Sequence, residues 1–331
     1  MKAVVFDRYG PPERLRLEEV DRPTPKASEV LIRVHAATVS AEDPKMRSFD
    51  HPPMFWLPIA LLFGFPRPRV RILGMELSGE IEAVGSAVTR FDVGDQVFGY
   101  TGIGLGAHAE YKCISERGIL ARKPKSSTFE EAAAAPNGAL TALVYLRNMG
   151  KLAAGEQLLV YGASGAVGTA AVQIAKRLGA HVTAVCSTRN LELTLALGAD
   201  RVVDYTKENF ASSGSRYDVV FDTVGKTTFS QARACLNPKG RYLVTVFGLL
   251  DLFRMAWSWL GGDVRMVGGA SNFHWRTGDL ERLASWMEAG EFRSVIDRCY
   301  PLSEAADAHH YVQRGHKRGN VVLKMPADDR R

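Results

Sequence analysis

Residues 160–168 read Val-Tyr-Gly-Ala-Ser-Gly-Ala-Val-Gly, so an apolar strand passes through a glycine turn directly into a helix. Gly165 lets a diphosphate approach the backbone, Gly168 lets the helix pack against the strand, and the helix N-terminus offers N–H groups to an anion. The strict dinucleotide fingerprint has glycine where this chain has Ala163, so an ordinary strand-turn-helix is the alternative. We expect the dinucleotide to contact the following positions: Ser164, Gly165, Ala166, Val167 and Gly168.

The surrounding sequence favours the dinucleotide reading. Apolar residues recur at helical spacing from Ala170 until Gly179 ends the helix. Strands are predicted at 157–160, 181–186, 201–205, 218–222 and 241–246, and helices at 191–197 and 229–236. Alternating strands and helices imply a parallel sheet covered on both faces. The fold class is therefore α/β, with a Rossmann-type doubly wound sheet.

The end of the second predicted strand indicates which nicotinamide cofactor binds. An NAD site usually presents Asp or Glu there, whereas this chain has Ser187-Thr188-Arg189-Asn190. A hydroxyl and a guanidinium can bind a 2′-phosphate, so Ser187 and Arg189 favour NADPH. The alternative is that Ser187 or Asn190 caps the following helix, and the two roles can coexist.

Length, charge and cysteine content limit the class of protein. A chain of 331 residues predicts two domains. The net charge of +6 is scattered rather than gathered in a stripe, which argues against nucleic acid. The four cysteines form no C-x-x-C pair and no signal peptide precedes them, so we expect a reduced, cytoplasmic protein.

The two ends of the chain differ from its middle in their predicted secondary structure. Short strands are predicted at 1–6, 29–36, 79–84 and 95–98, which indicates a mostly β, barrel-like N-terminal unit. A last Rossmann helix is expected at 280–289, followed by a strand near Ile296, a helix at 303–313 and a strand at 320–324. We predict a substrate domain of residues 1–122 plus 293–331 around a cofactor domain of residues 123–292.

Several motifs in one order resemble a known family. They are Met1-Lys2-Ala3-Val4-Val5, Gly74-Met75-Glu76-Leu77-Ser78-Gly79, Val93-Gly94-Asp95-Gln96-Val97-Phe98-Gly99, residues 162–168, Leu197-Gly198-Ala199-Asp200 and residues 315–322. Over essentially its whole length the chain is similar to zinc-independent medium-chain dehydrogenases/reductases of the quinone oxidoreductase and zeta-crystallin branch. The resemblance implies a GroES-like barrel domain, NADP(H) bound between the domains, and a homodimer.

Residues at several further positions are implied by the resemblance to contact the cofactor. Ser40 and Thr141 would lie near the nicotinamide, and Ser187, Arg189 and Tyr205 near the 2′-phosphate. Around the rest of the cofactor the resemblance implies Phe247, His316, Lys317 and Arg318. Tyr205 could instead close the sheet edge, Thr141 could be a routine helix residue, and the basic tail cluster could be a solvated face.

The zinc ligands of the zinc-dependent branch are absent. That branch has cysteine near Ser40, histidine at Met75 and a further cysteine near Asn137 and Gly138. Zinc needs several N or S ligands in tetrahedral array, so no metal is predicted. The alternative that His51 or His108 joins Glu76 is left open.

Without a metal to stabilise an alkoxide, reduction of a quinone or other lipophilic conjugated carbonyl is favoured over oxidation of simple alcohols. The alternatives are a 2-alkenal or enone reductase, an alcohol or aldehyde oxidoreductase, and a crystallin-like protein that binds NADPH without turnover. Asp43, Lys45, His51 and Tyr100 fall in segments expected to border the cleft. Because solvent can protonate the product, no catalytic acid is assigned.

Two apolar segments, 54–65 and 249–260, are too short to span a bilayer. One interpretation is that both segments are buried in the core. The second follows a parallel strand, so we favour a lining or lid for a lipophilic substrate. For the first, next to Arg67, Arg69 and Arg71, a dimer interface and a peripheral membrane contact are left open.

Overall fold

The computed structural model describes residues 1–326, which form two compact units. The first comprises Met1–Asn137 together with the chain from Arg276 onward, and the second is Gly138–Trp275. These bounds differ from the predicted 122 and 292, because α3 (Phe129–Ala133) packs on the strands of the first unit and so does α9 (Thr277–Glu288). The last part of the predicted segment 293–331, residues 327–331, lies outside the described chain.

The second unit contains a six-stranded parallel sheet in the order β10-β9-β8-β11-β12-β13. Its strands are β8 (Gln157–Tyr161), β9 (His181–Cys186), β10 (Arg201–Asp204), β11 (Tyr217–Asp222), β12 (Leu236–Val244) and β13 (Arg265–Gly268). This is the Rossmann order, which reverses direction between β8 and β11. The predicted fold class is confirmed, although β13 was not predicted.

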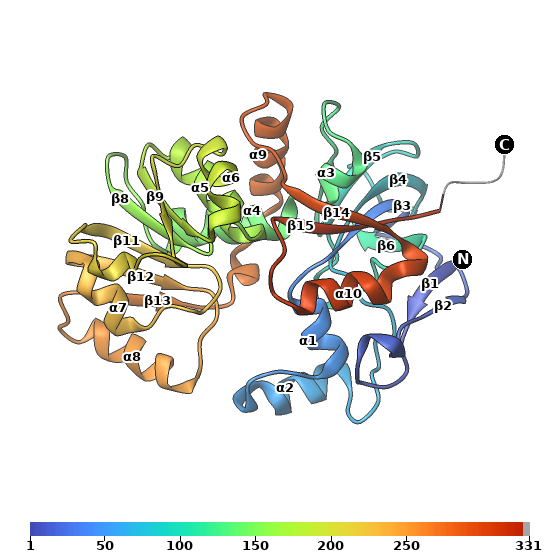
Figure 1. Ribbon diagram of the computed structural model, residues 1–331. Coiled ribbons are helices and arrows are strands. Elements are labelled where there is room, and N and C mark those ends of the chain that lie inside the picture. Colours follow the sequence, from blue (N-terminus) through green and yellow to red (C-terminus); the bar gives the residue numbers. More distant parts are fainter. Residues whose placement is uncertain (327–331) are drawn as a thin grey trace. The chain divides into compact units, whose positions relative to one another are not determined.

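Helices cover both faces of this sheet, as Figure 1 shows. They are α4 (Pro136–Leu143), α5 (Ala166–Arg177), α6 (Leu191–Ala196), α7 (Phe229–Cys235) and α8 (Leu249–Trp259). α5 and α6 pack on β8, β9 and β10, whereas α7 and α8 pack on β12 and β13 on the opposite face. This arrangement follows from right-handed crossovers that run outward from β8 in one direction and from β11 in the other.

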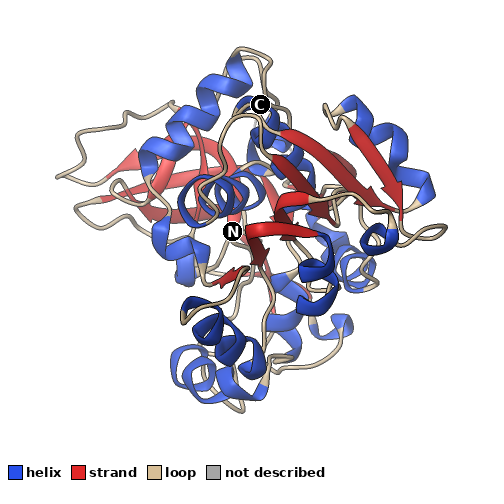
Figure 2. Cartoon of the chain, turned by 90° about the vertical axis from the view of Figure 1, so that its left-hand side faces the viewer, coloured by secondary structure: helices blue, strands red, loops and turns tan. Residues whose placement is uncertain are grey.

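The first unit is mostly β. Figure 2 draws the strands of the whole chain in red and its helices in blue. A seven-stranded sheet has the order β14-β15-β3-β4-β5-β7, with β6 paired to β3, and β1 and β2 form a separate pair. The strands are β1 (Lys2–Val5), β2 (Arg16–Glu19), β3 (Glu29–Val39), β4 (Glu76–Val84), β5 (Gln96–Tyr100), β6 (Tyr111–Ser115), β7 (Ile119–Arg122), β14 (Ile296–Pro301) and β15 (Asn320–Lys324). Because β15 pairs with β3, the chain end returns to the N-terminal sheet as expected.

The remaining helices of this unit are α1 (Glu42–Ser48), α2 (Pro53–Phe63) and α10 (Ala305–Gln313). The prediction that residues 280–289 form a Rossmann helix is wrong in its placement. α9 belongs to the first unit, where Thr277 donates a hydrogen bond to the Gly118 carbonyl and Arg90 pairs with Glu281. No local pattern distinguishes a helix on one sheet from a helix on the other, since both bury one apolar face.

Candidate functional site

The glycine turn after β8 brings α5 unusually close to the strand. Gly162 has φ +78°, and its carbonyl accepts a hydrogen bond from the Gly165 N–H at 3.1 Å. A Cβ on Gly168 would lie 2.1 Å from that same carbonyl oxygen and 2.7 Å from the Cα of Ala163. Only glycine fits at position 168, so the close packing predicted there is present in the structure.

The N-terminus of α5 suits an anion. Gly165 is its N-cap residue and no side chain caps this end of the helix. A Cβ on Gly165 would meet only the Gly162 carbonyl oxygen, at 3.6 Å, so the protein itself leaves room at this position. The first-turn N–H groups of a helix lack intrahelical partners and lie at the positive end of its dipole. A dinucleotide diphosphate therefore fits the residues present here.

Asn190 ties the glycine turn to the loop that follows β9. Its side chain is buried, and Nδ2 donates to Ser164 Oγ and to Ser187 Oγ, each at 3.1 Å. Neither Ser187 nor Asn190 caps the helix that begins beside it with its side chain. The capping alternative is therefore wrong, and the side chain of Asn190 instead fixes Ser187 next to the turn.

Arg189 and Tyr205 lie on neighbouring segments. Arg189 is exposed in the turn after β9, and the Tyr205 N–H donates to the Cys186 carbonyl at 3.1 Å. Tyr205 is 48 % exposed, and its ring lies 6.2 Å from that of Tyr161. The structure therefore groups Arg189 and Tyr205 at the carboxyl ends of β9 and β10, beside Ser187.

Asp204 is a site residue that the sequence analysis missed. It accepts hydrogen bonds from the hydroxyls of Thr188 and Thr206, and the bond from Thr188 is the main cause that lowers its pKa. The parallel register pairs Asp204 with Cys186, so the carboxylate reaches the loop after β9 from the neighbouring strand. The pairing of β10 with β9 brings Asp204 to this loop, and no spacing in the sequence indicates that proximity.

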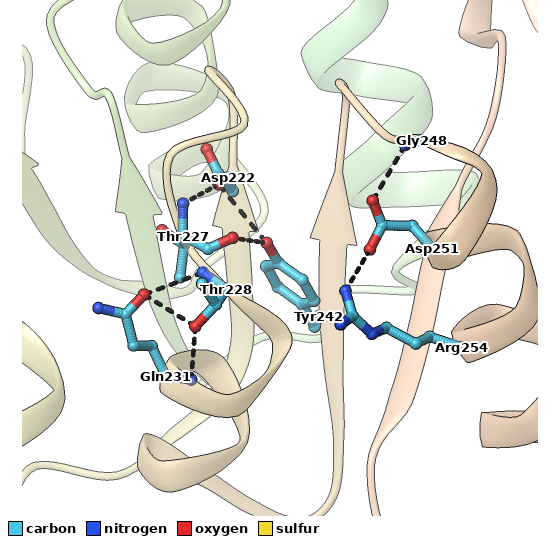
Figure 3. A network of polar contacts seen from close by, with 8 residues as sticks. All are labelled: Asp222, Thr227, Thr228, Gln231, Tyr242, Gly248, Asp251 and Arg254. Carbon is cyan, nitrogen blue, oxygen red and sulfur yellow. Dashed lines mark hydrogen bonds and ion pairs between the residues drawn. The ribbon is translucent and has the colours of Figure 1, made fainter.

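The loops after β11 and β12 are fixed by a polar network (Figure 3). Asp222, fully buried, accepts the N–H groups of Val224, Gly225 and Thr227 at 2.7–2.9 Å, and burial raises its pKa. Tyr242 donates to the Thr227 carbonyl at 2.7 Å. These contacts hold the carboxyl ends of the central strands in one shape, at the edge where ligands bind such sheets.

Two more predicted cofactor residues belong to the second unit. Phe247 is half-buried after β12 and packs against the core of the sheet. Thr141 is buried on α4 and accepts a hydrogen bond from Ser271 Oγ at 3.4 Å. The unit thus contains every predicted cofactor residue from Thr141 to Phe247.

α8 is not buried in the core, which contradicts that interpretation of segment 249–260. Only Ser258 is buried, while Leu250, Trp257 and Leu260 are 69 %, 78 % and 83 % exposed. The helix starts at the carboxyl edge of the sheet and runs back toward the start of β13. A groove of about 550 Å³ is lined by residues of both α7 and α8, among them Phe229 at the start of α7, Phe253 in α8 and Val264 before β13.

The first unit places Ser40 against a buried carboxylate. Asp43 is fully buried, and its Oδ2 accepts both the N–H and the hydroxyl of Ser40 at 2.7 Å. Its Oδ1 accepts the Gly74 N–H at 2.9 Å. The Ser40 hydroxyl hydrogen is thus already donated to Asp43, and its oxygen accepts the Glu42 N–H at 3.2 Å, which leaves one lone pair for another contact.

Glu76 is the other buried carboxylate of this unit. The antiparallel register of β3 and β4 sets Thr38 opposite it, and the Thr38 hydroxyl donates to Glu76 Oε2. The Asn137 N–H donates to Oε1 at 2.7 Å. Burial raises the pKa of Glu76 to about 7, against these two hydrogen bonds.

The basic tail cluster interacts electrostatically with this carboxylate through Lys317. Burial lowers the pKa of Lys317 to about 8, an effect that Glu76 opposes, and Lys317 Nζ donates to the Gly319 carbonyl at 2.6 Å. Arg318 and His316 are exposed, and the Arg318 N–H donates to Asp297. Lys317 is therefore not part of a solvated face. Ser40 and residues 316–318 belong to the first unit, apart from the other predicted cofactor residues.

Metal ligands are not gathered in the described part of the chain. Within residues 1–326 no three or more His, Cys, Asp or Glu side chains are grouped to hold an ion. Met75 accepts a hydrogen bond from the Tyr100 hydroxyl through its sulfur, and His108 Nε2 is hydrogen-bonded to the Thr38 carbonyl at 2.9 Å.

Comparisons with known proteins cover nearly the whole chain. Residues 26–125 match the alcohol dehydrogenase GroES-like domain, and residues 197–323 match the zinc-binding dehydrogenase family. A quinone-oxidoreductase homolog of spinach (Spinacia oleracea) chloroplasts is 32 % identical over 98 % of both chains. An NADPH-dependent alkenal/one oxidoreductase of Arabidopsis thaliana chloroplasts is 32 % identical over 98 % of this chain and 79 % of its own.

A solved structure agrees with these relatives. The quinone oxidoreductase from Coxiella burnetii is 31 % identical, superposes with a TM-score of 0.86, and covers 98 % of this chain and 99 % of its own. With the Rossmann strand order, the GroES-like match and this similarity over the full length, the chain belongs to the medium-chain dehydrogenase/reductase superfamily, in its quinone oxidoreductase-like branch.

Proposed function

We propose that this protein is an NADPH-dependent oxidoreductase that reduces a quinone or another lipophilic conjugated carbonyl, and that it works without zinc. The observation that carries the proposal is the pairing of two features in the second unit. One is the open N-terminus of α5 at Gly165, and the other is the loop with Ser187 and Arg189, tied to it through Asn190.

Each feature has a separate task in this proposal. The first-turn N–H groups of α5 would bind the diphosphate, since they are donors at the positive end of a helix. Ser187, Arg189 and Tyr205 would bind the 2′-phosphate, for which a guanidinium gives charge-assisted hydrogen bonds. When bound, NADPH supplies the hydride that a conjugated carbonyl accepts. The contacts proposed for Thr141, Phe247, Ser40, His316, Lys317 and Arg318 rest on the family resemblance.

The acceptor class is proposed from the relatives and from the donor set. Two relatives are named for quinone and for alkenal or enone reduction. At the positions of zinc ligands in the zinc-dependent branch, Ser40 donates to Asp43 and Met75 carries a thioether, and neither offers the thiolate or imidazole that zinc prefers. Orientation and hydrogen bonds then suffice for a substrate whose charge delocalises. We include a cytoplasmic homodimer in the proposal and assign no catalytic side chain.

The test is a turnover screen with the full chain, following NADPH or NADH consumption with quinones, 2-alkenals, enones and simple aldehydes. We expect turnover with conjugated acceptors and NADPH, and a loss of the NADPH preference in Arg189→Ala. Arg201→Ala is the matched control, because Arg201 is an exposed arginine at the opposite end of β10, hydrogen-bonded to Ser215.

Three outcomes would overturn parts of the proposal. No turnover with any acceptor, despite NADPH binding, would favour a binding-only, crystallin-like protein. Preference for simple aldehydes or alcohols would favour an alcohol oxidoreductase. Zinc in stoichiometric amount in the active purified protein would refute zinc independence.

A further inference from the structure

α2 is an apolar helix that buries none of its residues. Its sequence, Pro-Met-Phe-Trp-Leu-Pro-Ile-Ala-Leu-Leu-Phe, contains no polar side chain apart from the indole N–H, yet no position from Pro53 to Phe63 is buried. The most exposed side chains are Leu57 at 69 %, Leu61 at 65 % and, just after the helix, Phe65 at 60 %. Exposing large apolar side chains in one patch is unfavourable in water and marks an interaction surface.

The helix is nevertheless firmly attached to its unit. Tyr9 donates to the Gly64 carbonyl at 2.6 Å, and its ring lies 4.9 Å from Phe49, which also contacts Trp56 and Phe65. The indole N–H of Trp56 donates to the His51 carbonyl at 3.0 Å. These contacts hold one side of α2 against the unit and leave the other side outward. Leu57 and Leu61 share that outer side, since they are four residues apart, and Leu62 beside Leu61 is 49 % exposed.

The chain segment that contains α2 is basic, although its Arg71 also pairs with Glu18 at 3.8 Å. From His51 to Met75 the chain contains no Asp or Glu, whereas Arg67, Arg69 and Arg71 follow the helix and are all exposed. Arg69 donates to the Leu61 carbonyl at 2.8 Å, which keeps this basic stretch next to the apolar side of the helix. An apolar side that borders a half-exposed tryptophan and is flanked by arginines has the chemistry of a helix that lies in a membrane interface.

The charge also decides between occupants. A second copy placed on this surface about a twofold axis would bring the same arginine-rich stretch against itself. An anionic lipid surface instead gives each arginine a phosphate partner and gives the leucines an acyl boundary. At 11 residues α2 is too short to cross a bilayer, and no helix within residues 1–326 has the length and apolar character to do so.

We propose that α2, with Arg67, Arg69 and Arg71, docks this protein on the surface of bilayers that contain anionic phospholipid. The outer side of α2 enters the interface between headgroups and acyl chains, and the arginines bind lipid phosphates. This inference is independent of the proposed cofactor and acceptor.

The experiment is co-sedimentation of the full chain with vesicles of phosphatidylcholine, alone or mixed with phosphatidylglycerol. We expect binding to the mixed vesicles that weakens as salt rises. The double variant Leu61→Asp, Leu62→Asp should bind at least about tenfold more weakly, because two apolar side chains are lost from the interface. Arg67→Glu should weaken binding to mixed vesicles while leaving the weak binding to phosphatidylcholine alone unchanged.

Matched controls are available in the same unit. Ile103→Asp changes another side chain that is 64 % exposed, and Lys125→Gln removes an exposed charge away from α2. Both should bind vesicles as the wild type does. A second readout uses lipids with brominated acyl chains, which should quench wild-type tryptophan fluorescence but quench Trp56→Phe less.

Specific results would overturn the proposal. The first is no binding to mixed vesicles by the wild type. The second is equal binding by the wild type and the double leucine variant. The third applies if the wild type does not bind vesicles. If the double leucine variant then sediments as a smaller species than the wild type, α2 is an interface between copies.

Discussion

Gly168 lies directly against the carbonyl oxygen of Gly162, where a Cβ would approach to 2.1 Å, while Gly165 in the same turn would meet that oxygen only at 3.6 Å. These two glycines, three residues apart, therefore have different roles. One is required for the helix to pack on β8, and the other leaves space for a ligand.

This difference predicts opposite effects of the same substitution. Gly168→Ala should lower the free energy of unfolding by about 1–3 kcal/mol, because the methyl group overlaps backbone that cannot move aside. Gly165→Ala should change it by less than about 1 kcal/mol, since the position is an N-cap with ordinary φ. Urea unfolding measures the first effect. Titration with NADPH should show weaker binding by Gly165→Ala, and equal destabilisation by both variants would refute the distinction.

Asp43 predicts a large stability effect in the first unit. Asp43→Ala removes the acceptor of three hydrogen bonds, from the Ser40 N–H, the Ser40 hydroxyl and the Gly74 N–H. Buried donors left without a partner are costly, so we expect a loss of about 3 kcal/mol in the free energy of unfolding. Asp50→Ala, at an exposed position just beyond α1, is the control and should stay within about 0.5 kcal/mol of the wild type. If Asp43→Ala lowers the free energy of unfolding by less than about 1 kcal/mol, the three hydrogen bonds to Asp43 do not stabilise the fold as expected.

Glu76 predicts how stability depends on pH. Its pKa rises from the ordinary 4.5 to about 7 on folding, so the folded state holds a proton that the unfolded state releases in this interval. The contribution of Glu76 is fully present below pH 4.5 and is lost as pH rises toward 7. The shift corresponds to about 3 kcal/mol.

The free energy of unfolding should therefore decline less between pH 4.5 and 7 in Glu76→Gln than in the wild type. Urea titration at several pH values measures this difference. The amide can still accept from the Asn137 N–H, so the variant keeps one of the two hydrogen bonds. Glu19→Gln, at an exposed position of β2, should keep the wild-type pH dependence. The same decline in Glu76→Gln as in the wild type would assign the effect to another group.

Asn190 predicts a coupling between two loops. Asn190→Ala removes both hydrogen bonds that join Ser164 to Ser187. We expect weaker binding of NADPH by roughly tenfold, because the diphosphate and 2′-phosphate contacts would no longer be held in one geometry. Thr194→Ala, in the next helix turn, is a buried control whose hydroxyl bonds only within that region. Unchanged NADPH binding by Asn190→Ala would show that the tie does not position the cofactor site.

The parts of the fold that could be predicted are those with local signals. The glycine turn and the alternation of strands and helices identify the Rossmann sheet, because each element carries its own period and its own turn residues. β13 was missed because its four residues, Arg-Met-Val-Gly, carry too short a pattern. α9 was assigned to the wrong unit because an amphipathic helix does not specify which sheet it covers.

The parts of the site that could not be predicted depend on register. Asp204 reaches the loop after β9 only because β10 pairs with β9 in parallel, and Glu76 meets Thr38 only through the pairing of β3 with β4. Lys317 interacts electrostatically with Glu76, and the chain end that carries Lys317 returns as β15 next to β3. Contacts of this kind have no sequence spacing that could reveal them.

In the proposed complex, Ser187 and Arg189 recognise the 2′-phosphate of a dinucleotide whose diphosphate lies at Gly165. The most direct measurement is the Kd of NADPH and of NADH for the wild type and for Arg189→Ala, at one fixed ionic strength. We expect the variant to bind NADPH at least about tenfold more weakly while its affinity for NADH changes by less than about twofold, since only NADPH carries the phosphate. An equal loss for both dinucleotides, or no loss for NADPH, would contradict this proposal.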